Sequence, residues 1–310
     1  MNIGIIGVGG VGGYFGGKLT KLLQREEYKE ALNIYFLARN KHLEEIKENG
    51  LILSTKDEGE IICKPTLATD NFDELPQLDI CLLCVKSYDF NNTLKLLKSK
   101  IKDDTKIIAL LNGIDNYARV REVIPNGVLY PACVYVGTCI ERYGKVTQNG
   151  GSCTIIFGSD PAKAVVYPQE LLDLFDACGI KYKWTKDPYM EIWSKYMFIA
   201  AYGMVTACED KTLGMVLESK DSSSKVKGIM QEIKNIADKL EINLPENIVE
   251  ESFNKGREFT YETKTSFHRD FEQKNKKNEG ELFGDTIIKL GIELGVETPI
   301  SIIVNQKLKQ

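Results

Sequence analysis

The amino-terminal segment constrains the fold most, because a short apolar run leads directly into a glycine-rich turn. Residues 3–6 read Ile-Gly-Ile-Ile, and Gly7, Gly9 and Gly12 follow with the spacing GxGxxG. In a strand–turn–helix unit, the first glycine permits a tight turn and the second allows close backbone approach to a pyrophosphate. The third lets the helix pack against the strand, and the helix N-terminus supplies N–H donors for an anion.

The context of this pattern favours a dinucleotide-binding site over the alternative, a glycine-rich turn with no ligand. The pattern follows an apolar run, precedes a helix-forming stretch and starts a strand–helix–strand unit, as such a site requires. The expected contacts to the cofactor come from the six residues of the loop, Gly7, Val8, Gly9, Gly10, Val11 and Gly12.

The first half of the chain alternates short apolar runs with amphipathic stretches. Strands are predicted at residues 3–8, 32–38, 80–85 and 107–111, and helices at 11–23, 41–48, 90–97 and 117–123. Such alternation is typical of an α/β fold, in which crossover helices join the strands of a parallel sheet. Residues 51–69 and 129–157 are predicted to add further β-structure.

The second half is predicted to be mostly helical. A helix at 168–178 and a strand at 180–185 precede Asp187-Pro188, an N-cap followed by proline at the first helical position. Helices are then expected at 188–206, 222–242, 246–262, 280–295 and 299–308. We therefore expect a Rossmann-type parallel-sheet domain over residues 1–180 and an all-helical domain over residues 181–310.

The composition excludes several classes of protein. The chain has 310 residues, which suggests about two domains. The formal net charge of −4, without a basic stripe or recognition motif, argues against a nucleic-acid partner. No apolar window of about 18 residues free of charge is present, and the first residues carry no basic targeting region. We expect a cytoplasmic protein that is not associated with a membrane.

Histidine and cysteine usage argues against a metal site. The two histidines, His42 and His268, are far apart, and among eight cysteines only Cys81 and Cys84 form a CxxC. These two thiols lie in an apolar run that reads as a buried strand, and no second CxxC completes a zinc site. Dispersed core cysteines fit a reducing compartment.

The end of the second predicted strand indicates which nicotinamide cofactor is preferred. An NAD site usually has an acidic residue there for the ribose 2′-hydroxyl, but this strand is followed by Arg39, with Lys41 as a weaker second cation. An arginine can instead pair with the 2′-phosphate of NADPH. The alternative is a surface arginine with no ligand.

Polar residues follow two further strands. Lys86 comes after residues 80–85, and Asn112-Gly113 comes after residues 107–111. Ligands of open α/β sheets bind outside the carboxyl ends of the strands, so these residues are expected near the glycine loop. Taken alone, Lys86 could be a loop lysine and Asn112-Gly113 a common turn.

Lys195 is the candidate proton donor. On the helix predicted from residue 188 it shares a face with Glu191, Ile192, Phe198 and Ile199. An apolar surrounding desolvates a lysine and makes it release its proton more readily. The alternative is an exposed pair between Glu191 and Lys195, one helical turn apart, and spacing alone does not choose between the two.

These motifs together resemble the ketopantoate reductase family (2-dehydropantoate 2-reductase). The resemblance spans essentially the whole chain and rests on motifs in a specific order, namely GxGxxG, Val85-Lys86, Asn112-Gly113, Trp193-x-Lys195 and Thr265-Ser266-Phe-x-Arg-Asp270. It implies a Rossmann domain that binds NADPH and a helical domain related to that of 6-phosphogluconate dehydrogenase-type enzymes. The implied reaction is reduction of ketopantoate to pantoate in pantothenate biosynthesis.

The resemblance also implies roles for individual residues. Lys195 matches the family's catalytic lysine, and Lys86 and Asn112 match residues that line the cofactor and active site. Ser266 matches a serine that binds the polar end of the substrate. Glu279 matches a late glutamate that helps to orient cofactor and substrate.

Two departures from the family's pattern bear on the identity of the substrate more than on the fold. Ile199 and Gly203 replace asparagines that many members carry after the lysine. The segment 272–278 is one residue longer than usual, so Glu281 competes with Glu279 for the glutamate's place. The chain could therefore reduce another branched 2-oxo acid, and a non-catalytic NADPH-binding regulator is the alternative of a different class. The apolar helix faces are compatible with a homodimer.

Overall fold

A computed structural model describes residues 1–165, 167–273 and 277–310, and the chain divides into two compact units. The first comprises Met1–Leu111 and Asp115–Pro188, and the second comprises Asn112–Ile114 and Tyr189–Gln310. The first unit extends past the expected boundary at residue 180. The reason is that β11 (Lys181–Trp184) pairs with a strand of the first unit.

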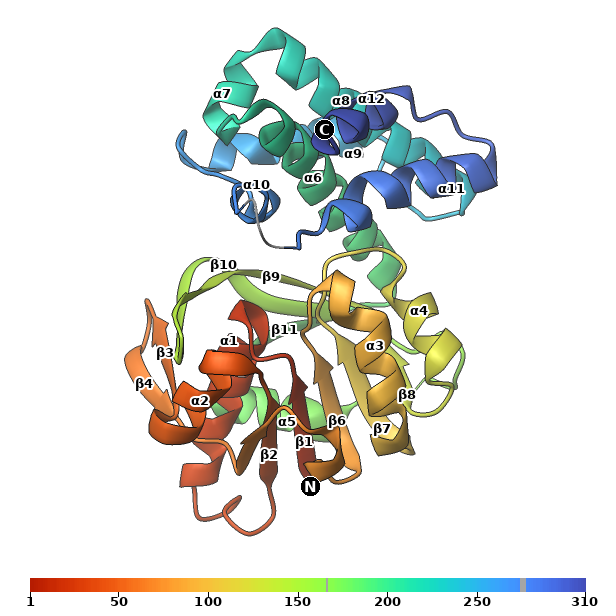
Figure 1. Ribbon diagram of the computed structural model, residues 1–310. Coiled ribbons are helices and arrows are strands. Elements are labelled where there is room, and N and C mark those ends of the chain that lie inside the picture. The colour runs from red at the N-terminus through yellow and green to blue at the C-terminus, as the bar shows by residue number, and fades with distance from the viewer. Residues whose placement is uncertain (166, 274–276) are drawn as a thin grey trace. The chain divides into compact units, whose positions relative to one another are not determined.

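The first unit contains a six-stranded sheet in which every recorded pair is parallel (Figure 1). The strand order is β5-β2-β1-β6-β7-β8, which corresponds to the Rossmann order 3-2-1-4-5-6. The strands are β1 (Asn2–Ile6), β2 (Asn33–Leu37), β5 (Leu67–Thr69), β6 (Leu78–Leu83), β7 (Ile101–Ala109) and β8 (Val128–Tyr130). The predicted Rossmann-type sheet is confirmed.

Two details of the strands differ from the prediction. The four predicted strands end one or two residues early, at Ile6, Leu37, Leu83 and Ala109, where the chain turns toward the glycine loop and the helices. β7 begins at Ile101, six residues before the predicted start. The polar residues 102–106 interrupt the apolar run that indicates a buried strand, so the sequence pattern does not predict this part of β7.

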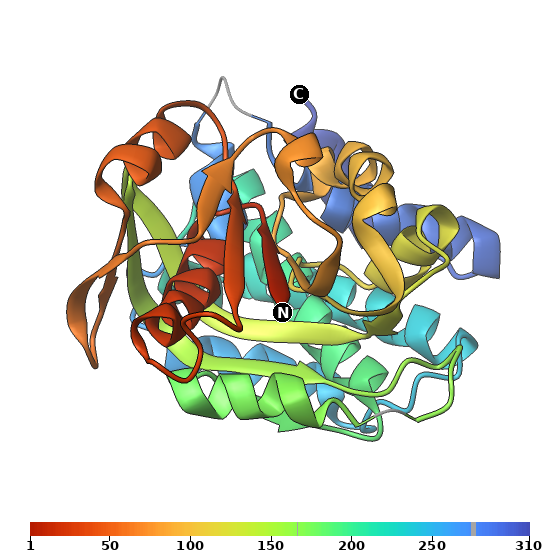
Figure 2. The same ribbon diagram turned by 90° about the horizontal axis from the view of Figure 1, so that it is seen from below.

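Helix α1 (Gly10–Thr20) packs between this sheet and a second one. The second sheet has the order β11-β10-β3-β4, and β9 (Ala132–Arg142) pairs with β10 (Lys145–Phe157) in antiparallel fashion. It includes β3 (Leu51–Thr55) and β4 (Gly59–Cys63), so both predicted β-rich segments are confirmed. The helix is seen between the two sheets in Figure 2. Its residues Tyr14 and Phe15 belong to a buried apolar cluster that includes residues of both sheets.

The other face of the six-stranded sheet is covered by α3 (Ser87–Leu97) and α4 (Asn116–Val123) (Figure 1). Phe90, Leu94 and Val120 are fully buried against Ile6 and Leu83 of the sheet. Because both faces are covered, the strands read as nearly continuous apolar runs rather than as alternating ones. The unit also contains α2 (Asn40–Asn49) and α5 (Gln169–Cys178).

The second unit is built on the long helix α6 (Pro188–Glu209), which begins at the predicted proline. Its middle is buried on several sides by the other helices. These are α7 (Leu213–Glu218), α8 (Lys220–Lys239), α9 (Ile248–Lys255), α10 (Ser266–Phe271), α11 (Thr286–Leu294) and α12 (Pro299–Leu308). Among the described residues, no helix combines the length and the hydropathy that a membrane span requires.

The helices of this unit differ from the predicted ones in three main respects. The helix expected at 246–262 ends at Lys255, with a short 3-10 turn through Glu258. The helix expected at 280–295 begins with a π-helical segment, Glu281–Asp285. The six-residue helices α7 and α10 were not predicted, because each spans fewer than two turns and shows little periodicity.

Burial of His42 is expected to make the free energy of unfolding depend on pH. Its Nδ1 accepts a hydrogen bond of 3.0 Å from the N–H of Gly144, and burial lowers the pKa of the imidazole. Below the usual histidine pKa of about 6.5, the unfolded chain therefore takes up a proton that the folded chain resists. The free energy of unfolding is expected to fall by at most about 1.4 kcal/mol per pH unit through this group.

A His42→Asn variant keeps an acceptor for Gly144 but does not titrate. Its urea midpoint should match that of the wild type at pH 8 and should fall less between pH 8 and pH 5.5. Equal losses in the two proteins would remove His42 as a source of acid sensitivity.

Candidate active site

The glycine loop has the geometry that a pyrophosphate requires. Gly7 has a φ of +96°, and a Cβ there would lie 2.8 Å from Cγ1 of Val85. A Cβ on Gly12 would overlap the carbonyl oxygen of Gly7. Around Gly9, by contrast, a Cβ would meet no heavy atom within 4 Å among the described residues other than its own chain neighbours. The loop thus combines a tight turn, close packing of helix on strand and an open backbone surface.

The open side of this loop is the N-terminus of α1. Gly9 is the N-cap residue and, being glycine, has no side chain to cap the helix. Its carbonyl oxygen accepts the first helical bond from the N–H of Gly13 at 2.7 Å. The N–H groups of Gly10, Val11 and Gly12 therefore precede the first intrahelical donor. Such N–H groups and the positive end of the helix dipole suit a phosphate group, so the loop fits a dinucleotide.

Hydrogen bonds hold four strand ends side by side around the loop. The N–H groups of Gly7 and Val8 donate to the Leu37 oxygen at 3.0 and 3.2 Å, which joins the loop to the end of β2. The Cys84 N–H donates to the Ile6 oxygen at 2.8 Å, and that of Leu110 donates to the Leu83 oxygen at 2.8 Å. The residues that follow these ends therefore lie along one edge of the sheet.

Arg39 and Lys86 follow two of these strand ends, as predicted. Arg39 is the N-cap residue of α2, and its Nη2 donates to Oδ2 of Asp89 at 2.6 Å. Lys86 is exposed and is the N-cap residue of α3. Asp89 was not predicted as a site residue, because it follows a different strand from the arginine that it contacts.

Lys195 and Asn112 are brought together directly. Lys195 Nζ donates a 2.8 Å hydrogen bond to Asn112 Oδ1, and both residues belong to the second unit. Asn112 lies in the turn after β7, where Gly113 has a φ of +123°. Lys195 is half-buried on α6. Two residues 83 positions apart in the sequence thus meet at one point.

The region around Ser266 is tied to the same helix as Lys195. Ser266 is the exposed first residue of α10. The hydroxyl groups of Thr265 and Thr206 are hydrogen-bonded at 2.9 Å, which attaches the start of α10 to α6. A Cβ on Gly203 would lie 3.4 Å from Cβ of Phe267, so the missing asparagine at 203 coincides with close packing of α10.

A second contact between α10 and the end of α6, made by His268, was not predicted from the sequence. His268 is almost fully buried, and its Nε2 lies 2.9 Å from Oδ1 of Asp210 at the end of α6. The only signal was the rarity of histidine, because nothing local relates residue 268 to residue 210.

The two candidate glutamates differ in burial. Glu279 is 4% exposed, whereas Glu281 is exposed and begins the π-helical segment. Tyr196 ties this segment to α6, because its hydroxyl donates to the Leu282 oxygen at 2.9 Å and to the Phe283 oxygen at 3.1 Å. π-helical turns are frequent at functional sites. Part of the lengthened segment before Glu279, residues 274–276, lies outside the described residues.

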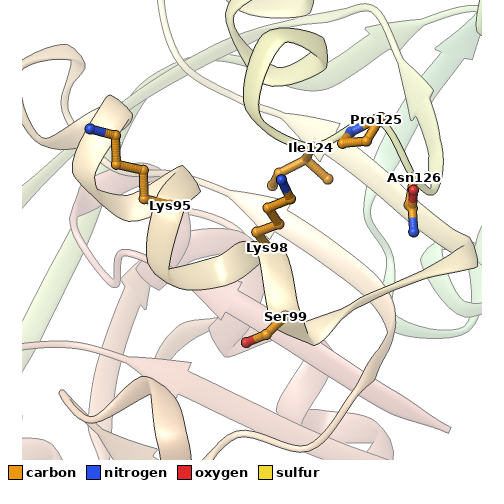
Figure 3. Close-up of a pocket in the computed structure, with 6 residues that line it drawn as sticks. All are labelled: Lys95, Lys98, Ser99, Ile124, Pro125 and Asn126. Carbon is orange, nitrogen blue, oxygen red and sulfur yellow. The ribbon is translucent and has the colours of Figure 1, made fainter.

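A cavity of about 440 Å³ lies elsewhere in the first unit (Figure 3). It is lined by Lys95, Lys98, Ser99, Ile124, Pro125 and Asn126. These residues come from the end of α3, the turn after it and the segment between α4 and β8, so the cavity lies where β7 and β8 begin. The glycine loop lies at the edge where the strands end, so this cavity is not part of the candidate site.

The Rossmann-order sheet, the glycine loop and the helix-borne lysine define an oxidoreductase with a helical second unit. A family model described as ketopantoate reductase PanE/ApbA matches residues 3–161, and its C-terminal counterpart matches residues 189–310. The chain belongs to the ketopantoate reductase PanE/ApbA family.

Individual relatives are distant but cover most of the chain. An uncharacterized oxidoreductase, YkpB of Bacillus subtilis, is 24% identical over 97% of this chain and 95% of its own. A 2-dehydropantoate 2-reductase of Streptococcus pyogenes is 25% identical over 83% of each chain. The ternary structure of D-mandelate dehydrogenase with NADH and anilino(oxo)acetate is 20% identical, with a TM-score of 0.84 over 100% of this chain and 97% of that one. The last likeness shows the fold alone.

Proposed function

We propose that this protein is an NADPH-dependent reductase of ketopantoate that forms pantoate for pantothenate biosynthesis. The observation that carries the proposal is the 2.8 Å hydrogen bond between Lys195 Nζ and Asn112 Oδ1. This bond joins the candidate proton donor to the residue that follows β7. The family relationship and the 2-dehydropantoate 2-reductase among the relatives support the choice of substrate.

Lys195 is proposed as the proton donor to the substrate. When bound, the nicotinamide supplies a hydride to the carbonyl carbon of the 2-oxo acid. The Lys195 ammonium stabilises the negative charge that develops on the carbonyl oxygen and donates a proton from Nζ to it. Asn112 orients the ammonium, because its Oδ1 accepts one of the three N–H bonds.

The remaining site residues are proposed to bind and orient. Ser266, exposed at the start of α10, offers a hydroxyl to the polar end of the substrate. Glu279, buried beside the π-helical segment, helps to orient substrate and cofactor, and its burial supports the choice of Glu279 over Glu281. The loop from Gly7 to Gly12 holds the pyrophosphate, and Arg39 and Lys86 supply positive charge at the neighbouring strand ends.

A second candidate substrate is another branched or bulky 2-oxo acid. Gly203 has no side chain and lies next to Phe267, so no side-chain amide at this position contacts a substrate hydroxyl. Ile199 places a half-buried apolar side chain one turn after Lys195. D-mandelate dehydrogenase, whose structure contains anilino(oxo)acetate, has the same fold. An apolar substrate side chain would suit this surface better than the hydroxyl of ketopantoate.

The test is a steady-state assay of cofactor oxidation with a panel of 2-oxo acids, each measured with NADPH and with NADH. We expect the highest kcat/KM for ketopantoate with NADPH. A kcat/KM for another 2-oxo acid more than about tenfold higher would reject ketopantoate as the substrate and keep the reaction class. No turnover with any acid, together with tight NADPH binding, would reject an enzymatic function and favour a non-catalytic NADPH-binding regulator.

A further inference from the structure

The ion pair between Arg39 and Asp89 lies where a Rossmann site recognises the adenosine ribose. Arg39 follows β2, and Asp89 lies in the first turn of α3, which follows β6. In the sheet, β2 and β6 are the two neighbours of β1. The 2.6 Å contact between Arg39 Nη2 and Asp89 Oδ2 therefore spans the end of β1, from which the glycine loop departs.

We infer that Asp89 is a specificity-determining residue for the cofactor. It supplies, from α3, the carboxylate that the end of β2 lacks, so that NADH is accepted beside NADPH and the preference for NADPH is moderate. The inference rests on the proposed function only in requiring a nicotinamide cofactor, and it does not depend on which 2-oxo acid is reduced.

The guanidinium of Arg39 favours NADPH, whereas the carboxylate of Asp89 favours NADH. An arginine at this place pairs with a 2′-phosphate, whereas a carboxylate accepts a hydrogen bond from a ribose 2′-hydroxyl. Asp89 also repels the phosphate, because two negative charges would share one guanidinium. Removing the carboxylate charge should therefore strengthen NADPH binding, and removing the acceptor oxygen should weaken NADH binding.

The structure keeps Asp89 in place independently of Arg39. Arg119 of α4 donates from Nη2 to Asn91 Oδ1 at 3.0 Å and to the Ser87 oxygen at 3.5 Å. Its guanidinium also lies over the Phe90 ring, 4.8 Å from the centroid. These contacts fix the first turns of α3 against α4. The position of the helix turn that carries Asp89 therefore does not depend on the ion pair with Arg39.

Arg39 is able to change partner because its ion pair is exposed. Its side chain is 63% exposed and that of Asp89 is 27% exposed. An ion pair with this exposure contributes little to stability and is weakened by salt. A phosphate can therefore take the guanidinium without a large loss in folding free energy.

The test is a titration of the whole protein with NADPH and with NADH, followed by cofactor fluorescence without substrate. Asp89→Asn keeps the shape and an acceptor oxygen but removes the charge. It should lower the Kd for NADPH about tenfold, which corresponds to about 1.4 kcal/mol, and change that for NADH by less than about threefold. Asp89→Ala should raise the Kd for NADH several-fold. The gain in NADPH affinity from Asp89→Asn should be smaller at about 0.5 M salt, because salt screens the repulsion that the substitution removes.

Asp238→Asn is the matched control, because Asp238 is a 51% exposed aspartate that also forms an ion pair, with Lys234, but in the helical unit. It should change neither Kd. Equal changes for the two cofactors in Asp89→Asn, or an unchanged Kd for NADPH, would overturn the role of Asp89. Failure of the wild type to bind either cofactor would also overturn it. If no 2-oxo acid is turned over but Asp89→Asn still changes the Kd for NADPH and not that for NADH, only the proposed reaction is rejected.

Discussion

Replacing Lys195 by alanine is expected to lower kcat by about 10² to 10⁴-fold, the range for loss of a general acid. The substitution removes both the proton donor and the positive charge that stabilises the developing alkoxide. The Kd for NADPH should stay within about threefold, because Lys195 lies on α6 and the glycine loop lies in the first unit. Steady-state kinetics and a fluorescence titration measure the two effects separately.

Lys289→Ala controls for loss of a lysine from the helical unit, since Lys289 is 74% exposed. That variant should keep its activity. Lys195→Arg keeps the charge but not the position of the donor, and it should recover only part of the lost rate. Turnover by Lys195→Ala within about tenfold of the wild type would remove Lys195 from the proposed role.

Replacing Gly12 by alanine is expected to damage both folding and cofactor binding. The new Cβ would overlap the Gly7 oxygen and crowd Cβ of Cys84 at 3.0 Å, so α1 and the loop would have to move apart. Overpacking of this kind costs about 1–3 kcal/mol, and the shifted N–H groups would no longer converge on a phosphate. A lower thermal midpoint and a Kd for NADPH raised at least about 100-fold, or about 2.7 kcal/mol, are expected.

Gly9→Ala separates these two effects. A methyl group at this position meets open space, so stability should fall only by the small N-cap preference for glycine over alanine, whereas the close approach of a pyrophosphate would be blocked. Gly150→Ala is the matched control. Gly150 lies on β10, outside the loop, and a Cβ there also meets no neighbour within 4 Å. This variant should bind NADPH normally. A normal Kd for NADPH in both Gly9→Ala and Gly12→Ala would place the cofactor elsewhere.

Most of the first unit could be predicted from local pattern. The apolar runs located β1, β2 and β6, and the glycine spacing located the start of α1, because these elements depend on residues close together in the chain. The start of β7 was missed, since its polar residues 102–106 break the apolar run. The short helix α10 was missed because six residues carry almost no periodicity.

The candidate site was only partly predictable. Arg39, Lys86 and Asn112 were located as residues that follow strand ends, a rule that depends on chain order alone. Asp89 was missed as the partner of Arg39, and Asp210 as the partner of His268, because these contacts join residues 50 and 58 positions apart. Pairs of this kind depend on how the elements pack, which single-sequence patterns do not encode.

The sequence by itself determined the Rossmann-type sheet, the glycine loop and the helical second half, since each rests on local spacing or on residue order. It pointed to Lys195 as the candidate lysine through the order of the motifs that resemble the ketopantoate reductase family. Only the tertiary structure decided that Lys195 contacts Asn112, that Glu279 is buried while Glu281 is exposed, and that Arg39 is paired. It also decided that β11 completes the first unit. The physical reason is that burial and ion pairing depend on side chains that folding brings together from distant parts of the chain.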